Sequence, residues 1–392
     1  MKTTTAAINP RFPRNDAYGA LAMPVYHCCA YEFPDHQAMI DSFTGVSDDP
    51  DYSRVTNPTV IHFENIIKRL SGAADAVAFT SGMAAISAAM MALLKAGDKI
   101  VTSRHMFGNT YLLFTSTLAR FGVETVLVDL TNPEEVRRAV DSRTRCVYLE
   151  TITNPQMEIA DVRAIADIAH GAGACVVADT TMIPFTYADA RALGIDVEIL
   201  SSTKYLSGGA TSLGGVVIDY GTADGFGRAL RKDILMNLGG YMTPHAAYMQ
   251  TLGLETLDAR YAVHERNARA IAEGLSAIEG VKVNWPGLPD NPWHEIATRQ
   301  FGGRYGAMLT LELPSEEDCF RMIDRLRIVR RATNLFDNRT LAIHPASTIF
   351  GTIDAATRES MDVSPRIVRI SVGLEDPEDI LADLRQAITG RD

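Results

Sequence analysis

The sequence predicts an α/β protein with a mostly parallel sheet, followed by a smaller α+β unit. Short apolar runs alternate with helical stretches between residues 57 and 201, a pattern typical of a parallel sheet covered on both faces. After about residue 250 the pattern changes to one long helical stretch, a few strands and a closing helix. A chain of 392 residues is also too long for one compact core. We therefore expect an N-terminal arm at 1–57, a large domain at 58–250 and a smaller domain at 251–392.

The individual elements follow from local signals. The arm contains five prolines and little periodicity, so it is expected to be extended. Asn57-Pro58 opens a helix that closes near Gly72. In the large domain the other helices are expected at about 82–95, 109–120, 134–140 and 162–170, and the strands at 76–79, 99–102, 125–128, 145–149, 175–178 and 198–201. In the smaller domain the helices are expected at about 257–278, 316–326 and 377–388, and the strands at 281–283, 308–313 and 368–372.

Composition excludes several classes of function. Lys+Arg number 37 against 48 Asp+Glu, and a net charge of -11 argues against nucleic-acid binding. The polar segment 1–16 does not resemble a secretory signal, and the apolar stretch 84–94 is too short to cross a membrane. The five cysteines include no CxxC pair, so neither a disulfide framework nor a zinc site is expected. A cytoplasmic protein without a metal is the expectation.

Two residues at strand ends suggest a carbonyl cofactor. Lys204, in Ser201-Ser-Thr-Lys204, directly follows a strand, where open α/β sheets bind ligands. A partly buried lysine can form a Schiff base, although a solvated loop lysine explains this motif equally well. Asp179 ends an earlier apolar strand, and its carboxylate can pair with a protonated pyridine nitrogen. An isolated aspartate is more commonly a helix cap, but its place before Lys204 favours the cofactor.

Three further motifs could bind anions. Thr80-Ser-Gly82-Met83 joins a strand to a helix, and bare amides at a helix N-terminus attract phosphate. Arg54 in Tyr52-Ser-Arg54 could clamp a phosphate, or it could be an ordinary surface arginine. Arg369 lies inside an apolar strand and needs an acidic partner, which is either a protein carboxylate or a substrate carboxylate. His344 could line a pocket but is more simply a hydrogen-bonded structural residue.

Together these motifs resemble the Cys/Met-metabolism family of pyridoxal-phosphate (PLP) enzymes, the cystathionine γ-synthase-like branch of fold type I. The matching segments run in family order along nearly the whole chain. They are 52–59, 81–83, 107–108, 150–151 with 154–155, 179–181, 201–208, 253–257, 344–346 and 369–375.

The resemblance implies a role for each matching residue. Lys204 would be the Schiff-base lysine and proton shuttle, and Asp179 the partner of the pyridine nitrogen. Arg369 would clamp the substrate α-carboxylate, with Asn334 beside it. The other implied cofactor contacts are Ser81, Gly82, Met83, Ser201 and Thr203 at the phosphate, Phe107 on the ring, Asn154 near the ring hydroxyl, and Thr181. Tyr52 and Arg54 would reach the phosphate of a neighbouring subunit, in a homotetramer built of two dimers. The resemblance also implies that the mostly parallel sheet of the large domain has seven strands.

The chain also departs from the family pattern. Phe107 replaces the stacked tyrosine, so stacking survives but a phenol that could protonate a leaving thiolate is lost. Members resembling O-succinylhomoserine sulfhydrylase share this phenylalanine. Gly209, Asn334 and Ile349-Phe350 replace a histidine, a serine and a Thr-His pair, and Asn109 replaces the cysteine typical of methionine γ-lyases.

Three functional hypotheses follow from this comparison. The leading one is γ-replacement on O-succinyl- or O-acetylhomoserine with a sulfur nucleophile, as in the sulfhydrylases and cystathionine γ-synthase. The alternative is a γ- or β-lyase that releases a thiol, a ketoacid and ammonia from methionine, cystathionine or cysteine. A more remote alternative is a non-catalytic PLP-family scaffold or regulator.

Overall fold

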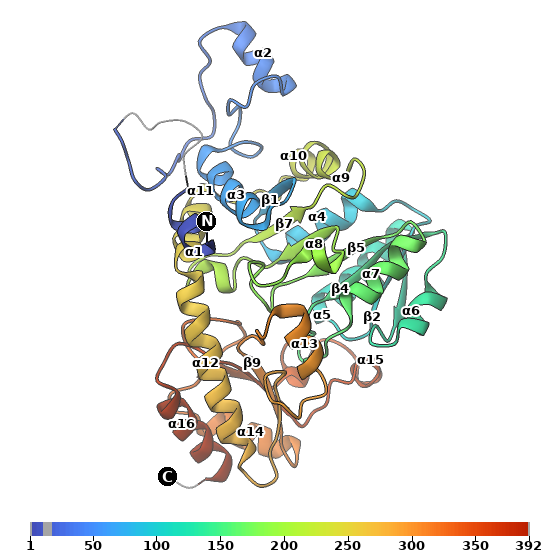
Figure 1. Ribbon diagram of the computed structural model, residues 1–392, viewed down its shortest axis with the longest axis vertical. Helices are drawn as coiled ribbons and strands as arrows, with labels where there is room; N and C mark the ends of the chain where they lie inside the picture. Colours follow the sequence, from blue (N-terminus) through green and yellow to red (C-terminus); the bar gives the residue numbers. More distant parts are fainter. Residues whose placement is uncertain (1, 11–17, 391–392) are drawn as a thin grey trace.

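Two β-sheets organise the chain, of which the structure, a computed structural model, describes residues 2–10 and 18–390 (Figure 1). The larger sheet has seven strands in the order β1-β7-β6-β5-β4-β2-β3. Its strands are β1 (Asp75–Phe79), β2 (Lys99–Ser103), β3 (Glu124–Val128), β4 (Thr144–Glu150), β5 (Cys175–Asp179), β6 (Val197–Leu200) and β7 (Gly215–Asp219). Neighbours from β6 to β3 run parallel, and β7 alone runs antiparallel to both β6 and β1. The predicted mostly parallel sheet is therefore confirmed.

Helices cover both faces of the large sheet because alternate strand residues point to opposite sides. In β1, Ala76 and Ala78 join a core with α3 (Pro58–Ser71) and α7 (Val162–Gly171). Val77 and Phe79 face the other side and pack with α4 (Gly82–Leu93). The remaining helices of this part are α5 (Gly108–Leu112), α6 (Pro133–Ala139), α8 (Ala190–Leu193), α9 (Phe226–Arg228), α10 (Met236–Leu238) and α11 (Pro244–Glu255).

Two predictions for this part needed correction. The helix expected at 109–120 is α-helical only through α5, and it continues as a π-helical turn over Leu113–Thr117 and a 3₁₀ turn over Leu118–Phe121. Strand β7 was not predicted, because its opening glycines are typical of a loop. In the structure Gly215 is needed for packing and not for a loop, since a Cβ atom there would lie 2.3 Å from the carbonyl oxygen of Ser81. This glycine therefore allows the start of α4 to approach the sheet closely.

The second sheet has five strands in the order β10-β11-β12-β9-β8. Its strands are β8 (Lys282–Asn284), β9 (Met308–Glu312), β10 (Arg330–Arg331), β11 (Leu341–Ile343) and β12 (Ile367–Ser371). The long helix α12 (Leu257–Ser276) runs from the large sheet down to this second sheet (Figure 1). The other helices here are α13 (His294–Phe301), α14 (Glu316–Arg325), α15 (Ala355–Ser360) and α16 (Pro377–Thr389).

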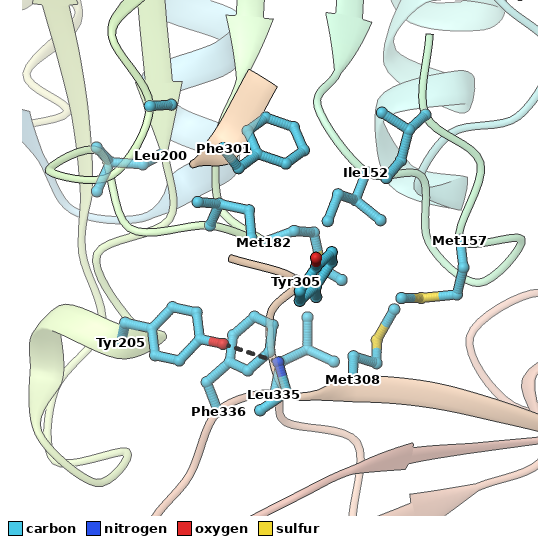
Figure 2. Close-up of a cluster of buried hydrophobic side chains, with 14 of the residues drawn as sticks. Ile152, Met157, Met182, Leu200, Tyr205, Phe301, Tyr305, Met308, Leu335 and Phe336 are labelled. Carbon is cyan, nitrogen blue, oxygen red and sulfur yellow. Dashed lines mark hydrogen bonds between the residues drawn. The ribbon is translucent and has the colours of Figure 1, made fainter. Parts of the chain in front are cut away.

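An apolar layer joins the two sheets below the strand ends of the larger one. Figure 2 shows Ile152, Met182 and Leu200 from the large-sheet side meeting Met308 and Leu335 from the second sheet and its loops. The phenol of Tyr205 accepts the backbone N–H of Ala307 across this layer at 3.2 Å (Figure 2). The relative placement of the loops from the two sheets is therefore fixed by a continuous buried core.

The N-terminal arm was predicted to be extended, but in the structure it contains two short helices. These are α1 (Thr3–Ile8) and α2 (His36–Thr44), the latter capped by Asp35 and ended by Gly45 at φ 77°. Figure 1 shows α2 far from both sheets. Several apolar side chains on the arm face solvent, including Leu21 at 100% and Val46 at 77% exposure. In the described residues, no helix combines the length and the apolar character that crossing a membrane requires.

Candidate active site

A cavity of about 330 Å³ lies where the carboxyl ends of the parallel strands meet loops of the second sheet. Most of the predicted site residues line it. They are Ser81, Gly82, Met83, Phe107, Asn154, Asp179, Thr181, Ser201, Thr203, Lys204 and Arg369. Its apolar floor includes Ile152, Met182 and Leu335 of the layer between the sheets (Figure 2). The eleven residues that were predicted from separate sequence motifs to form one site therefore lie in one cavity.

Lys204 enters the cavity just after β6. Its Nζ donates a hydrogen bond to Oδ1 of Asn334 at 2.8 Å. Burial, together with the positive charge of Arg369, lowers the pKa of Lys204 to about 8, and Asp179 opposes this only in part. The solvated loop lysine considered above is therefore wrong. A lysine with this pKa has a substantial neutral fraction near pH 8, as a nucleophilic amine requires.

Asp179 ends β5 at the base of the cavity. Its Oδ1 accepts the backbone N–H of Thr181 at 2.9 Å, and the phenol of Tyr148 lies 3.5 Å from Oδ2. Burial raises the pKa of this carboxyl above its ordinary value. A positively charged group placed against Asp179 would stabilise its ionised form, and a protonated ring nitrogen is such a group.

Another part of the cavity wall is built around the first turn of α4. Ser81 caps this helix by accepting the N–H of Ala84 at 3.1 Å, and helix geometry leaves the amides of Gly82 and Met83 without intrahelical acceptors. A Cβ atom on Gly82 would lie 2.8 Å from that of Ser201, so only glycine permits this approach. These groups form an anion site of the kind found at helix N-termini.

Two polar neighbours of this anion site are already engaged. The Thr203 hydroxyl donates to the carbonyl of Gly214 at 3.1 Å and accepts its N–H at 2.9 Å. The hydroxyl of Thr181 accepts the N–H of Ser201 at 2.8 Å, which ties the end of β5 to the lysine loop. The Ser201 hydroxyl and the amides at the start of α4 remain the groups best placed for a phosphate.

Arg369, in β12, lies on the side of the cavity facing the second sheet, and its side chain is 2% exposed. Its Nη1 donates to Oδ1 of Asn154 at 3.1 Å, and its Nη2 donates to the carbonyls of Thr333 at 3.1 Å and Asn334 at 3.4 Å. Its buried Nε has no hydrogen-bond partner, and within the described ranges no carboxylate forms an ion pair with it. Burial lowers the pKa of this guanidinium to about 9. The structural ion pair considered from the sequence is therefore absent from the described part of the chain.

Tyr52 and Arg54 lie outside this cavity. Both are exposed, the Arg54 guanidinium lies 5.5 Å from the centre of the Tyr52 ring, and Arg54 donates to the carbonyl of Met236. Their place on the arm leaves them outside the site of their own chain. The resemblance assigns them to a neighbouring subunit, and that remains a prediction.

The departures from the family pattern have local structural reasons or consequences. Asn334 uses its carbonyl oxygen on Lys204, and its neighbours Thr333 and Leu335 line the cavity instead. Gly209 has φ 124°, and a Cβ there would lie 2.5 Å from Nδ2 of Asn338, so a larger residue would strain the backbone and require the Asn338 amide to move. Phe350 is fully buried, and Ile349 contributes an apolar wall to the cavity.

Sequence reasoning did not assign a function to Glu150, which also lines the cavity. This carboxylate ends the apolar strand β4 just as Asp179 ends β5, so the same signal could have identified it. Leu335 and Ile349 also line the cavity, but no local pattern distinguishes them from other apolar loop residues.

The residues present fit the cofactor that the sequence analysis expects. The wall of the cavity combines an anion site, a buried carboxylate, an aromatic face at Phe107 and an amine with a lowered pKa. Gly82 lies close to Ser201, and because Gly82 has no side chain, the space between them stays open for a phosphate.

Comparisons with known proteins agree with this geometry. The sequence model of the family described as Cys/Met metabolism PLP-dependent enzyme matches residues 4–389. The chain is 36% identical to the L-methionine gamma-lyase of Porphyromonas gingivalis, over 95% of this chain and 94% of that protein. It is 34% identical to the O-succinylhomoserine sulfhydrylase of Mycobacterium tuberculosis, over 94% and 91%.

A solved structure shares the whole fold. It is a putative O-acetylhomoserine (thiol)-lyase from Campylobacter jejuni, with N'-pyridoxyl-lysine-5'-monophosphate. Its TM-score is 0.94 and its identity 28%, over 99% of this chain and 100% of that one. The chain therefore belongs to the Cys/Met-metabolism family of PLP-dependent enzymes, and it is a fold type I trans-sulfuration enzyme.

Proposed function

We propose that this enzyme catalyses γ-replacement on an O-acylhomoserine, with a sulfur compound as the nucleophile. The observation that carries the proposal is the composition of the cavity wall. Within the described residues that line the cavity there is no tyrosine, cysteine or histidine, and Phe107 presents only an aromatic face. A thiolate leaving group would need a proton donor there, whereas the carboxylate of an ester leaves without one.

The residues of the chain divide the work of this reaction. Bound PLP draws electrons away from the α-carbon of the amino acid. With PLP bound, Asp179 would keep the ring nitrogen protonated, and Phe107 would hold the ring by stacking. Lys204 would hold the cofactor covalently until the substrate amine replaces it. The freed Lys204 amine would then remove the α-proton and afterwards a proton from the β-carbon, so that the γ-acyloxy group leaves as a carboxylate and the sulfur nucleophile adds at the γ-carbon. Asn334 accepts from the Lys204 amine at 2.8 Å and so keeps it oriented.

Arg369 positions the substrate. Its guanidinium is buried without a carboxylate partner in the part of the chain that is described, and one Nε–H remains unbonded. A substrate α-carboxylate would supply the missing charge and hydrogen bond, with bidentate geometry. Asn154, which accepts from Nη1 at 3.1 Å, would hold the guanidinium plane in the orientation that this contact needs.

Product analysis tests the proposal directly. Purified enzyme is incubated with O-acetyl- or O-succinylhomoserine, with and without a sulfur nucleophile, and in parallel with methionine, cystathionine and cysteine. We expect an ester to be consumed and its γ-substituent to be replaced. Ketoacid release from methionine or cystathionine, with both esters untouched, would overturn the proposal in favour of a lyase. The similarity to the methionine gamma-lyase of P. gingivalis supports that second candidate.

We further propose that the active unit is a homotetramer in which two subunits complete each site. The arm supports this proposal, because Tyr18 is 98% and Leu21 100% exposed, more than an isolated chain would favour. Tyr52 and Arg54 lie on the same arm, away from the cavity of their own chain. Light scattering of the purified enzyme tests the assembly, and a monomer at micromolar concentration would contradict it.

A cytoplasmic location is also proposed. All five cysteines are free thiols, which suits a reducing compartment. Cell fractionation with an antibody to the chain would test it, and recovery in an extracellular or periplasmic fraction would contradict it.

A further inference from the structure

Glu150 is the buried carboxylate of the cavity for which the proposed mechanism has no use. It ends β4 directly beside Asp179, with which it is paired in the register of β4 and β5. The residue is 9% exposed and lines the cavity. Two carboxylates so close together and out of water repel each other, so an apolar residue would be less costly at this position.

The hydrogen bonds of Glu150 reach two loops of the active site. Its Oε1 accepts the backbone N–H of Phe107 at 2.7 Å, and its Oε2 accepts the backbone N–H of Asn154 at 3.2 Å. Phe107 carries the aromatic face of the cavity, and the side chain of Asn154 accepts from Arg369 at 3.1 Å. One carboxylate therefore connects the ring surface to the guanidinium.

Both bonds require acceptor oxygens. An ionised carboxylate offers an acceptor at each oxygen, whereas an amide of the same shape offers only one. Burial, followed by the charge of Asp179, raises the pKa of Glu150 to about 8, and the two backbone N–H groups oppose that rise. The two backbone N–H groups thus favour the ionised form, which predominates above about pH 8 and in which each oxygen of Glu150 accepts from one loop.

Glu198 provides an internal comparison. It is fully buried on β6, the strand on the other side of β5, and it accepts hydrogen bonds from Thr180 at 2.5 Å and from the phenol of Tyr220 at 2.7 Å. Its partners do not line the cavity. Glu198 therefore shares with Glu150 its burial and its proximity to the charge of Asp179, but it makes no hydrogen bond to a loop of the cavity.

We propose that Glu150 is a positioning residue that sets the Phe107 ring and the Asn154–Arg369 pair relative to each other. The inference rests on the proposed functions of Phe107 and Arg369. A positioning role for Glu150 differs from a purely structural role in one measurable consequence. Weakening Glu150 should alter the environment of the bound cofactor and the binding of the amino-acid substrate, beyond any change in stability.

The test compares Glu150→Gln with Glu198→Gln in the holoenzyme. Glutamine keeps the shape of the side chain but loses one acceptor, so one of the two loops is released. We expect Glu150→Gln to raise KM at least about tenfold, the loss that one charge-assisted hydrogen bond implies, and to change the visible circular dichroism of the cofactor. Glu198→Gln should leave both unchanged, and thermal unfolding of each apoprotein separates stability from these effects.

Wild-type KM and circular dichroism in a folded Glu150→Gln variant would overturn the inference. If that variant does not fold, Glu150→Asp replaces it, since it keeps the charge but shortens the reach to both loops. Unchanged KM and circular dichroism in Glu150→Asp would then overturn the inference equally. KM is measured on whichever amino acid the wild type consumes, so inactivity toward homoserine esters refutes only the proposed reaction.

Discussion

Replacing Arg369 by methionine should stabilise the apoprotein while it destroys substrate binding. The guanidinium is buried, and burial lowers its pKa from the ordinary 12.5 to about 9. At about 1.4 kcal/mol for each pH unit, the buried charge costs about 5 kcal/mol. Its three hydrogen bonds, to Asn154, Thr333 and Asn334, return roughly 1 kcal/mol each. About 2 kcal/mol of net cost remains for Arg369→Met to remove, provided that water in the cavity of the apoprotein satisfies the acceptors that the guanidinium leaves, since an unsatisfied buried acceptor costs about 1–3 kcal/mol.

Thermal unfolding of the apoprotein checks this prediction. A gain of about 2 kcal/mol corresponds to a rise in Tm of roughly 2 °C for a chain of this length. In the holoenzyme the same variant should lower kcat/KM about a hundredfold to a thousandfold, because the substrate carboxylate loses its partner. Arg369→Lys is the matched control: it keeps the charge without the planar fork, so it should weaken binding without the gain in Tm.

The reasoning is refuted if Arg369→Met lowers the apoprotein Tm by several degrees and leaves kcat/KM near the wild-type value. That pair of results would mean that the arginine serves the fold. A lower Tm with a lost kcat/KM would show that the hydrogen bonds outweigh the cost of burial, and it would refute the stability argument alone.

Three further predictions follow from the same structure. Lys204→Ala should fold but lose the visible cofactor band after dialysis. Wild-type apoprotein should bind PLP covalently at a rate that is half-maximal near pH 8, since burial lowers the pKa of Lys204 to about 8. A binding rate independent of pH between 6 and 10 would contradict this. Arg54→Ala and Lys204→Ala should each be inactive, but subunit exchange between them should restore part of the activity, and a mixture that stays inactive argues against shared sites. Burial opposes the charge of His105, but its contacts with Glu158 at 2.9 Å and Asp362 at 2.7 Å raise its pKa above 6.5. Its stabilising effect is therefore complete below about pH 6.5 and is lost as pH rises through the folded pKa, so denaturant unfolding of His105→Gln should lack this decline.

The sequence was most informative where one local rule decides the outcome. The helix at 58–71 was bounded by Asn57, Pro58 and Gly72, and the structure shows Asn57 accepting the N–H of Thr59 and Gly72 at φ 67°. Asp179 was recognised because a carboxylate at the end of an apolar strand is expensive to bury without a purpose. The helix prediction required no knowledge of distant parts of the chain, whereas the interpretation of Asp179 also used its place 25 residues before Lys204.

Other features depend on contacts that no local pattern encodes. The glycines at the start of β7 resemble a loop, but Gly215 is required by the close approach of Ser81 from another element. Asn334 was expected beside Arg369, where its backbone carbonyl lies, but the hydrogen bond of its side-chain oxygen to Lys204, 130 residues away in sequence, was not foreseen. The arm was predicted to be extended, whereas Asp35 and Gly45 bound a helix within it. The functions of Tyr52 and Arg54 stay predictions, because they require a second chain.

Two arginines, the partly buried Arg231 and the buried Arg369, show how the structure separates a residue that serves the fold from one that serves the site. Arg231 bonds Asp75 through two nitrogens, at 2.5 and 2.8 Å, and also bonds Glu64 at 3.0 Å. These carboxylates raise the pKa of Arg231, so its charge is stabilised by the chain itself. Arg369 has only amide and carbonyl oxygens as partners, and its pKa is lowered instead. Arg369 was singled out in the sequence because it lies inside an apolar strand, whereas Arg231 lies in a helical stretch with other charged residues. What separates them in the structure is the missing countercharge, and an arginine that the fold leaves without one is stabilised most when an anionic ligand arrives.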